Sequence, residues 1–200
     1  MALTQYQERR RLALFVLLIA AFLALLFVGS AWTEHVHETI EVAGLALIVV
    51  GIAGRIWCTL YIGGRKASEI VASGPYSISR NPLYVFSSIA AGGAGAATGS
   101  LLLGAIFMLG CAVAFRVVIL REERYLRDAF GADFDSYVAR VPRFLPNPAL
   151  YQDIRRVTVD TRLVYRTLTD GLVFFLALPF FETVELLQGS GYLPVLLRLY

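Results

Sequence analysis

The segment PLYVFSSIAAGGAGAATGSLLLGAIFMLGCAVAFRVVIL, residues 82–120, decides the fold of this chain. It holds two apolar stretches, 82–98 and 101–120, and a connection this short predicts two helices in a tight hairpin. The first stretch carries many small residues, including Gly95 and Gly99 at a GxxxG spacing. Small residues let helix backbones approach closely in a bilayer, because lipid supplies little hydrophobic drive between helices. We therefore expect a packed transmembrane hairpin.

The composition places this hairpin in an integral membrane protein. The 200 residues are 58% hydrophobic and 16% charged, with a mean hydropathy of +0.66. Soluble domains are roughly 45–50% apolar and about 25% charged, so the membrane class is favoured. The length suits one domain over residues 1–200. The net charge of +3 comes from clustered basic residues, which suit anionic lipids better than nucleic acid. The expected partner is the lipid bilayer, with no nucleic acid and no obligate protein partner.

Further apolar segments extend the hairpin to an all-α bundle of four or five spanning helices. Residues 12–29 form a run of 18 residues, longer than the roughly 7–15 of a signal peptide, and predict a first span. Residues 40–62 predict a second, in which Arg55 must face the bundle for a ligand contact or a structural pairing. Residues 171–187 predict a fifth span, with an interfacial or re-entrant helix as the alternative.

The distribution of lysine and arginine predicts the orientation. Basic residues gather before residue 12, in the loop at 63–81 and after residue 120, whereas the loops at 30–39 and 98–100 hold none. Cytoplasmic loops carry the excess of lysine and arginine, so the basic side is expected to face the cytosol, at the inner membrane if the source is bacterial. After residue 120 the helix is expected to leave the lipid and end near Gly131. A short helix over 133–140 completes a cytosolic helical cap.

Polar motifs lie on both sides of the hairpin at this expected cytosolic face. Gly74 and Tyr76 precede it, followed by the stretch RNPLY at 80–84, and the pair Glu122-Glu123 follows it. The stretch VPRFLP at 141–146 comes last. Taken alone, Glu123 also suits a helix-surface pair with Arg127 at i,i+4.

In this order the motifs resemble the isoprenylcysteine carboxyl methyltransferase and phospholipid methyltransferase family of integral membrane enzymes. That family shows Gly-x-Tyr, Arg-His-Pro-x-Tyr, a helical hairpin, a Glu-Glu pair and a Phe-Gly…Tyr…Val-Pro…Pro tail. The resemblance covers the middle third to half of the chain. Asn81 stands where the family has histidine, and asparagine keeps a donor and an acceptor but does not titrate near neutral pH. The matching residues are Gly74, Tyr76, Arg80, Pro82, Tyr84, Glu122, Glu123, Leu126, Phe130, Gly131, Tyr137, Val141, Pro142 and Pro146.

The resemblance implies methyl transfer from S-adenosylmethionine to a lipophilic acceptor, either the carboxylate of a prenylcysteine-like molecule or a lipid headgroup. It places the cofactor-binding core at about 70–147, with 150–200 as a membrane-associated segment. Methyl transfer needs positioning and desolvation more than a metal, so no metal ligand is expected. Catalytic roles fall to Arg80, Asn81 and Tyr84. The implied cofactor-binding residues are Gly74, Tyr76, Arg80, Asn81, Pro82, Tyr84, Glu122, Glu123 and Tyr137.

Two other interpretations stay open. The first is a methyltransferase fold that has lost activity. The second is a non-enzymatic membrane protein, such as a small transporter or a haem-handling subunit. The second would use the polar motifs as a structural cap. His35 and His37 offer ligands for a metal or haem, but their i,i+2 spacing suits a strand better than a helix. We expect a solvated loop there, Glu185 near a helix end at the interface, and Cys58 as a packing residue.

Overall fold

The computed structural model describes residue 20, residues 22–65 and residues 68–200. These residues are mostly helical, and the predicted first span at 12–29 lies largely outside them. Two 3-10 turns and two short strands accompany the helices. The elements are β1 (Val28–Ser30), α2 (Glu34–Ile62), α3 (Pro75–Ile78), α4 (Pro82–Ala96), α5 (Leu101–Phe130), α6 (Ala132–Arg140), η1 (Pro148–Leu150), α7 (Thr161–Leu172), η2 (Val173–Leu176), α8 (Ala177–Gly189) and β2 (Leu197–Leu199).

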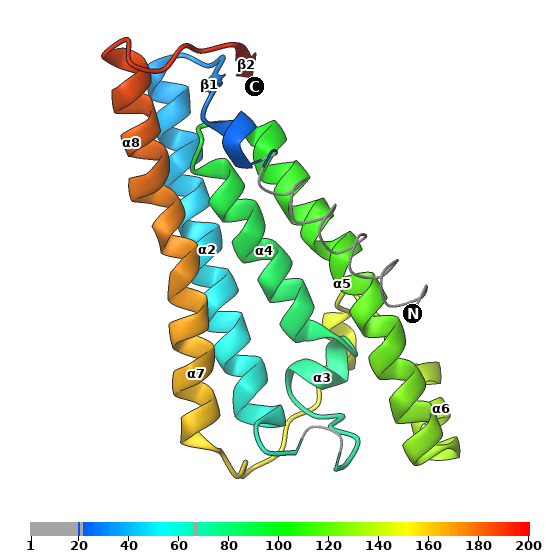
Figure 1. The fold of residues 1–200 in the computed structure, drawn as a ribbon. Helices are drawn as coiled ribbons and strands as arrows, with labels where there is room; N and C mark the ends of the chain where they lie inside the picture. Colours follow the sequence, from blue (N-terminus) through cyan, green and yellow to red (C-terminus); the bar gives the residue numbers. More distant parts are fainter. Residues whose placement is uncertain (1–19, 21, 66–67) are drawn as a thin grey trace, which may run out of the picture.

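Small residues hold the long helices close together, as the sequence predicts. Helix α4 packs between α2 and α5 (Figure 1). A Cβ on Gly93 would lie 2.4 Å from the carbonyl oxygen of Gly44 on α2. A Cβ on Gly95 would lie 2.6 Å from the carbonyl oxygen of Leu103 on α5. Neither backbone contact leaves space for a side chain, so glycine sets the spacing of the three helices.

Among the described residues, two helices, α2 and α5, are long and apolar enough to cross a membrane. The outer side of α5 exposes large apolar residues along its length, including Leu109, Val113 and Val117. Four or five spans are not confirmed by this finding. In the C-terminal segment, α7, η2 and α8 follow one another without a break beside α2 (Figure 1). This helical segment begins at Thr161, well before the predicted start at residue 171.

The all-α prediction is confirmed in its main part, because the described residues are mostly helical, with one short parallel pair of β1 and β2 in which Val28 lies opposite Leu197. One prediction at this end was wrong: residues 34–39 are not a loop, since α2 begins at Glu34. A glutamate in the first turn suits the helix dipole, and this local preference outweighs the strand-like spacing of the histidines.

The basic segments that flank the hairpin meet at one end of the bundle (Figure 1). Helix α3 and its loop lie there, together with the C-terminal end of α5, helix α6 and the chain that leads to α7. Helix α5 diverges from α4 toward this end. The turn between α4 and α5 lies at the other end, near β1 and β2. Both groups of polar motifs therefore come together, as the hairpin predicts.

Candidate active site

Gly74 sets the course of the chain into the site. Its φ is +57°, and a Cβ there would lie 2.4 to 2.7 Å from the ring of Tyr61. Glycine alone meets both demands without strain. Its N–H donates to the carbonyl of Gln152 at 2.7 Å, and Pro75 then begins α3 with the fixed φ that suits a first helical position.

A strap, residues 141–152, fastens the segment that carries Arg80 and Asn81. The Arg80 N–H donates to the Pro142 carbonyl at 2.9 Å. The Asn81 Nδ2 donates to the Arg143 carbonyl at 3.0 Å. The Ser79 hydroxyl, fully buried, donates to the Phe144 carbonyl at 3.0 Å. These bonds satisfy polar groups that burial would otherwise leave unpaired, so the strap and the segment form one unit.

Glu123 stands between two arginines. Its side chain is 8% exposed, and Arg80 Nη1 lies 3.2 Å from its Oε1, with Arg80 9% exposed. Arg143, 46% exposed, donates through Nε to Oε1 at 3.1 Å and to Oε2 at 3.0 Å, and its Nη2 lies 2.9 Å from Oε2. The predicted surface pair with Arg127 is absent from the described ion pairs of Glu123, because Arg127 pairs with Asp135 instead.

The Arg80 guanidinium keeps two donors that no described residue satisfies. Its Nε and Nη1 are buried and lack a hydrogen-bond partner within the described chain, although Nη1 lies at ion-pair distance from Glu123. Burial lowers the pKa of Arg80, and the Glu123 carboxylate opposes that shift. Arginine remains charged in proteins, so Arg80 is a buried cation at the wall of the site.

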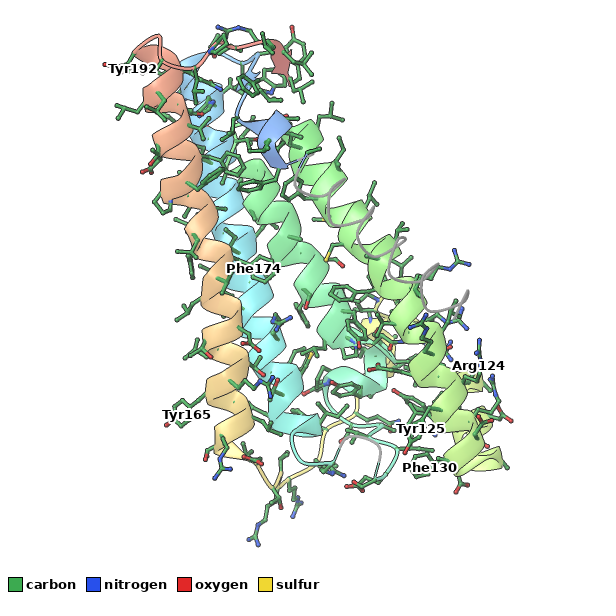
Figure 2. The ribbon with its side chains drawn as sticks, in the orientation of Figure 1. Arg124, Tyr125, Phe130, Tyr165, Phe174 and Tyr192 are labelled. Atoms are coloured by element: carbon green, nitrogen blue, oxygen red, sulfur yellow. The ribbon has the colours of Figure 1, made fainter. Side chains whose placement is uncertain are left out.

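Three tyrosines complete the polar part of the site. The Tyr137 hydroxyl donates to the Tyr76 carbonyl at 2.8 Å, which joins α6 to α3. Burial raises the pKa of both the Tyr76 and Tyr137 phenols, so they stay neutral. The Tyr84 hydroxyl interacts with the Glu122 carboxylate on α5. In Figure 2, Tyr125 lies on the side of α5 that faces α3, whereas Arg124 lies on the opposite side.

These residues border an open pocket at this end of the bundle. Seven of the nine predicted cofactor-binding residues line it, whereas Gly74 and Pro82 do not. Gly74 packs against Tyr61, and Pro82 is fully buried at the start of α4. The seven are Tyr76, Arg80, Asn81, Tyr84, Glu122, Glu123 and Tyr137.

The chain is similar to a known protein family and to two named proteins. A model of the phospholipid methyltransferase family matches residues 39–133. The cobalt-zinc-cadmium resistance protein CzcN of Cupriavidus metallidurans is 34% identical over 99% of this chain and 92% of its own length. The chain belongs to the phospholipid methyltransferase family. The nickel-cobalt-cadmium resistance protein NccN of Alcaligenes xylosoxydans is 32% identical over 98% of this chain and 93% of its own length. No solved structure matches the chain.

Sequence reasoning missed two parts of this family member's site. Arg143 lies in the quoted VPRFLP stretch, but only the returning strap shows that it contacts Glu123. Most of the pocket wall is apolar and was not predicted. A periodic apolar pattern marks burial but does not separate residues that line a cavity from residues that pack. The missed apolar lining is Ile62, Ile70, Val71, Leu83, Leu126 and Phe134.

Proposed function

We propose that this protein transfers a methyl group from S-adenosylmethionine to a lipophilic acceptor. The observation that carries the proposal is the buried Arg80 guanidinium, whose Nε and Nη1 lack a hydrogen-bond partner in the described chain and which lines the pocket. Leaving buried donors unsatisfied costs about 1–3 kcal/mol, and more for a charged group. A ligand carboxylate that accepts from Arg80 would remove this cost, and the cofactor carries one.

The other residues of the pocket fit the remaining parts of this cofactor. Glu122 supplies negative charge for an ammonium or a sulfonium, or acceptors for ribose hydroxyls. The donor set therefore agrees with a zwitterionic nucleoside. When bound, S-adenosylmethionine supplies an electrophilic methyl group on its sulfonium.

The protein's own residues would act by positioning and by excluding water. Glu123 contacts the Arg80 guanidinium, and the strap holds the Arg80 backbone N–H, so the residue has a fixed position. The apolar wall strengthens every charge interaction inside the pocket. Asn81 is committed to the Arg143 carbonyl, and we assign it to holding the strap and not to proton transfer. An acceptor carboxylate is ionised at neutral pH and needs no base.

The acceptor would enter from the bilayer. Tyr125 combines an exposed ring with a place in the pocket wall, on the helix whose outer side exposes large apolar residues. We place the pocket at the cytosolic face of a multi-pass bundle, because the flanking segments hold most of the arginines. A prenylcysteine-like carboxylate and a lipid headgroup are the acceptor classes that fit such an entry.

Isothermal titration of S-adenosylmethionine into the purified protein in detergent tests the proposal. Arg80→Met should weaken binding by at least about tenfold, since one charge-assisted hydrogen bond contributes about 1.5–3 kcal/mol. The matched control is Arg124→Met, which removes an arginine from the far side of α5 and should bind as the wild type does (Figure 2). Absence of binding to the wild type would refute the proposal.

The names of the two relatives suggest where this activity is used. Both names include resistance to cobalt and cadmium. We propose that the methyl transfer supports survival under those metals. A deletion strain should grow less well than its parent with added Co²⁺ or Cd²⁺. The wild-type gene should restore growth, and an Arg80→Met gene should not. Full rescue by the Arg80→Met gene would mean that resistance does not depend on the pocket.

A further inference from the structure

Three side chains of the metal-ligating type meet at the end of the bundle opposite the pocket. His37 and Glu41 lie one turn apart on α2, and Glu185 comes from α8. His37 Nε2 lies 3.0 Å from Glu185 Oε1 and 3.3 Å from Glu41 Oε1. One ligand atom from each residue lies within 4.8 Å of the other two. Tyr192 marks this end in Figure 2.

These distances suit one ion bound by all three residues. Zinc binds imidazole nitrogen at about 2.0–2.1 Å and carboxylate oxygen at about 2.0–2.2 Å, usually in a tetrahedron. Two ligand atoms of such a tetrahedron are about 3.3 Å apart. The two nitrogen-to-oxygen distances are therefore already close to those of a coordinated ion, before any side chain moves.

His37 is held in place and lacks the hydrogen bond that would explain its position. Its side chain is 15% exposed, and its Nε2 is buried without a hydrogen-bond partner among the described residues. Glu185 Oε1 and Glu41 Oε1 are both near enough to accept a hydrogen bond from Nε2, but neither lies in the direction that such a bond requires. The ring rests against the turn between α4 and α5, where a Cβ on Gly99 would lie 2.0 Å from Nδ1. The turn thus fixes the imidazole.

The charge around His37 is negative and lacks a basic partner. Within the described residues, neither Glu41 nor Glu185 forms an ion pair with a lysine or arginine. Glu182 adds a further negative charge near Glu185. Two carboxylates beside a buried nitrogen lone pair attract a cation, and a divalent one balances both.

We propose that His37, Glu41 and Glu185 bind one divalent transition-metal ion of the zinc type. Nitrogen and oxygen ligands without a thiolate suit Zn²⁺, Co²⁺ or Ni²⁺ better than a soft ion. Three protein ligands leave a fourth position open to water or to another ligand. The ion would fasten α8 to α2. This site stands apart from the methyl-transfer pocket, because 25 residues of α2 separate His37 from Ile62, a rise of about 37 Å.

The test is a zinc titration of the full-length protein in detergent after treatment with a chelator. The wild type should bind one Zn²⁺ per chain, with a higher Tm when the ion is present. His37→Gln and Glu185→Gln should each weaken binding by at least about tenfold, because even the loss of an outer-shell partner costs 10–100-fold. The matched control is His35→Gln, an exposed histidine on another face of α2, and it should bind as the wild type does.

Three results would overturn the proposal. These are a flat zinc titration of the wild type, unchanged affinity in His37→Gln, or an equal loss in His35→Gln. Retained S-adenosylmethionine binding, where the wild type binds it, and an unchanged metal-free Tm show that a variant is folded. If His37→Gln does not fold, Glu185→Gln at a 40% exposed position gives the same answer.

Discussion

Arg143 covers the carboxylate of Glu123 with two of its nitrogens, Nε at 3.0 and 3.1 Å from the two oxygens and Nη2 at 2.9 Å from Oε2. Glu123 belongs to α5, whereas Arg143 belongs to the strap that fastens Arg80 and Asn81. One buried carboxylate therefore connects the second helix of the hairpin to the segment that precedes the hairpin. The geometry of the pocket depends on this connection.

Glu123→Gln should destabilise the protein strongly. The amide leaves the buried Arg80 without a counter-charge, and breaking a buried ion pair costs about 3–5 kcal/mol. Thermal unfolding in detergent measures the loss. The control is Asp135→Asn, which breaks the exposed pair with Arg127 and should barely change Tm. Equal changes in the two variants would contradict the structural role of Glu123.

Gly74→Ala should destabilise the protein more than Gly131→Ala, although the backbone strain is similar at the two positions. Gly74 and Gly131 have similar φ values, +57° and +51°, so alanine is strained by about 1–2 kcal/mol at either position. A Cβ meets the Tyr61 ring at Gly74 but nothing within 4 Å at Gly131. The Tm of Gly74→Ala should thus lie clearly below that of Gly131→Ala. A Gly131→Ala variant as unstable as Gly74→Ala would rule out the clash.

Two variants of Asn81 test whether this position needs a hydrogen-bond donor or a titrating base. Asn81→His can still donate to the Arg143 carbonyl and should keep S-adenosylmethionine binding. Asn81→Asp places an acceptor against that carbonyl oxygen, which should loosen the strap and weaken binding. Titration calorimetry of the pair measures the difference. Equal binding by both variants would mean that the bond to Arg143 does not matter.

The contact between Tyr61 and Asp153 predicts a pH dependence. The Tyr61 hydroxyl donates to Asp153 at 2.6 Å, and this bond, with that from the Ile154 N–H, lowers the pKa of Asp153. A lowered folded-state pKa gives stability that is present above the unfolded value of about 3.9 and is lost as the pH falls through the folded value. Between pH 5 and 3, the Tm should fall less in Asp153→Asn and in Tyr61→Phe than in the wild type. Parallel curves of Tm against pH in the wild type and the two variants would exclude this contribution to stability.

The contrast between local and distant partners explains how much of this molecule could be predicted from its sequence. The hairpin and the extension of α5 to Phe130 followed from periodicity and from Gly131, which are local signals. The contact of Arg143 with Glu123 spans 20 residues and depends on how the strap returns. The pairing of β1 with β2 joins segments far apart in the chain. The sequence of one segment alone does not indicate which distant segment it will contact.

His37 shows how one wrong secondary-structure prediction hides a site. When residues 30–39 are predicted to be a loop, the only spacing considered is the one between His35 and His37. In the helix that begins at Glu34, His37 shares a face with Glu41 and meets Glu185 from α8. The spacing that mattered was i,i+4 and not i,i+2.

Transfer of labelled methyl groups is the most direct test of the central claim, that the pocket around Arg80 methylates a lipophilic acceptor. The full-length protein in vesicles of its own membrane lipids is incubated with methyl-labelled S-adenosylmethionine, and the organic extract is examined by mass spectrometry. We predict a labelled lipophilic product with the wild type and with Arg124→Met, and a product strongly reduced with Arg80→Met. No labelled product from the wild type, or equal label from Arg80→Met, would contradict the claim.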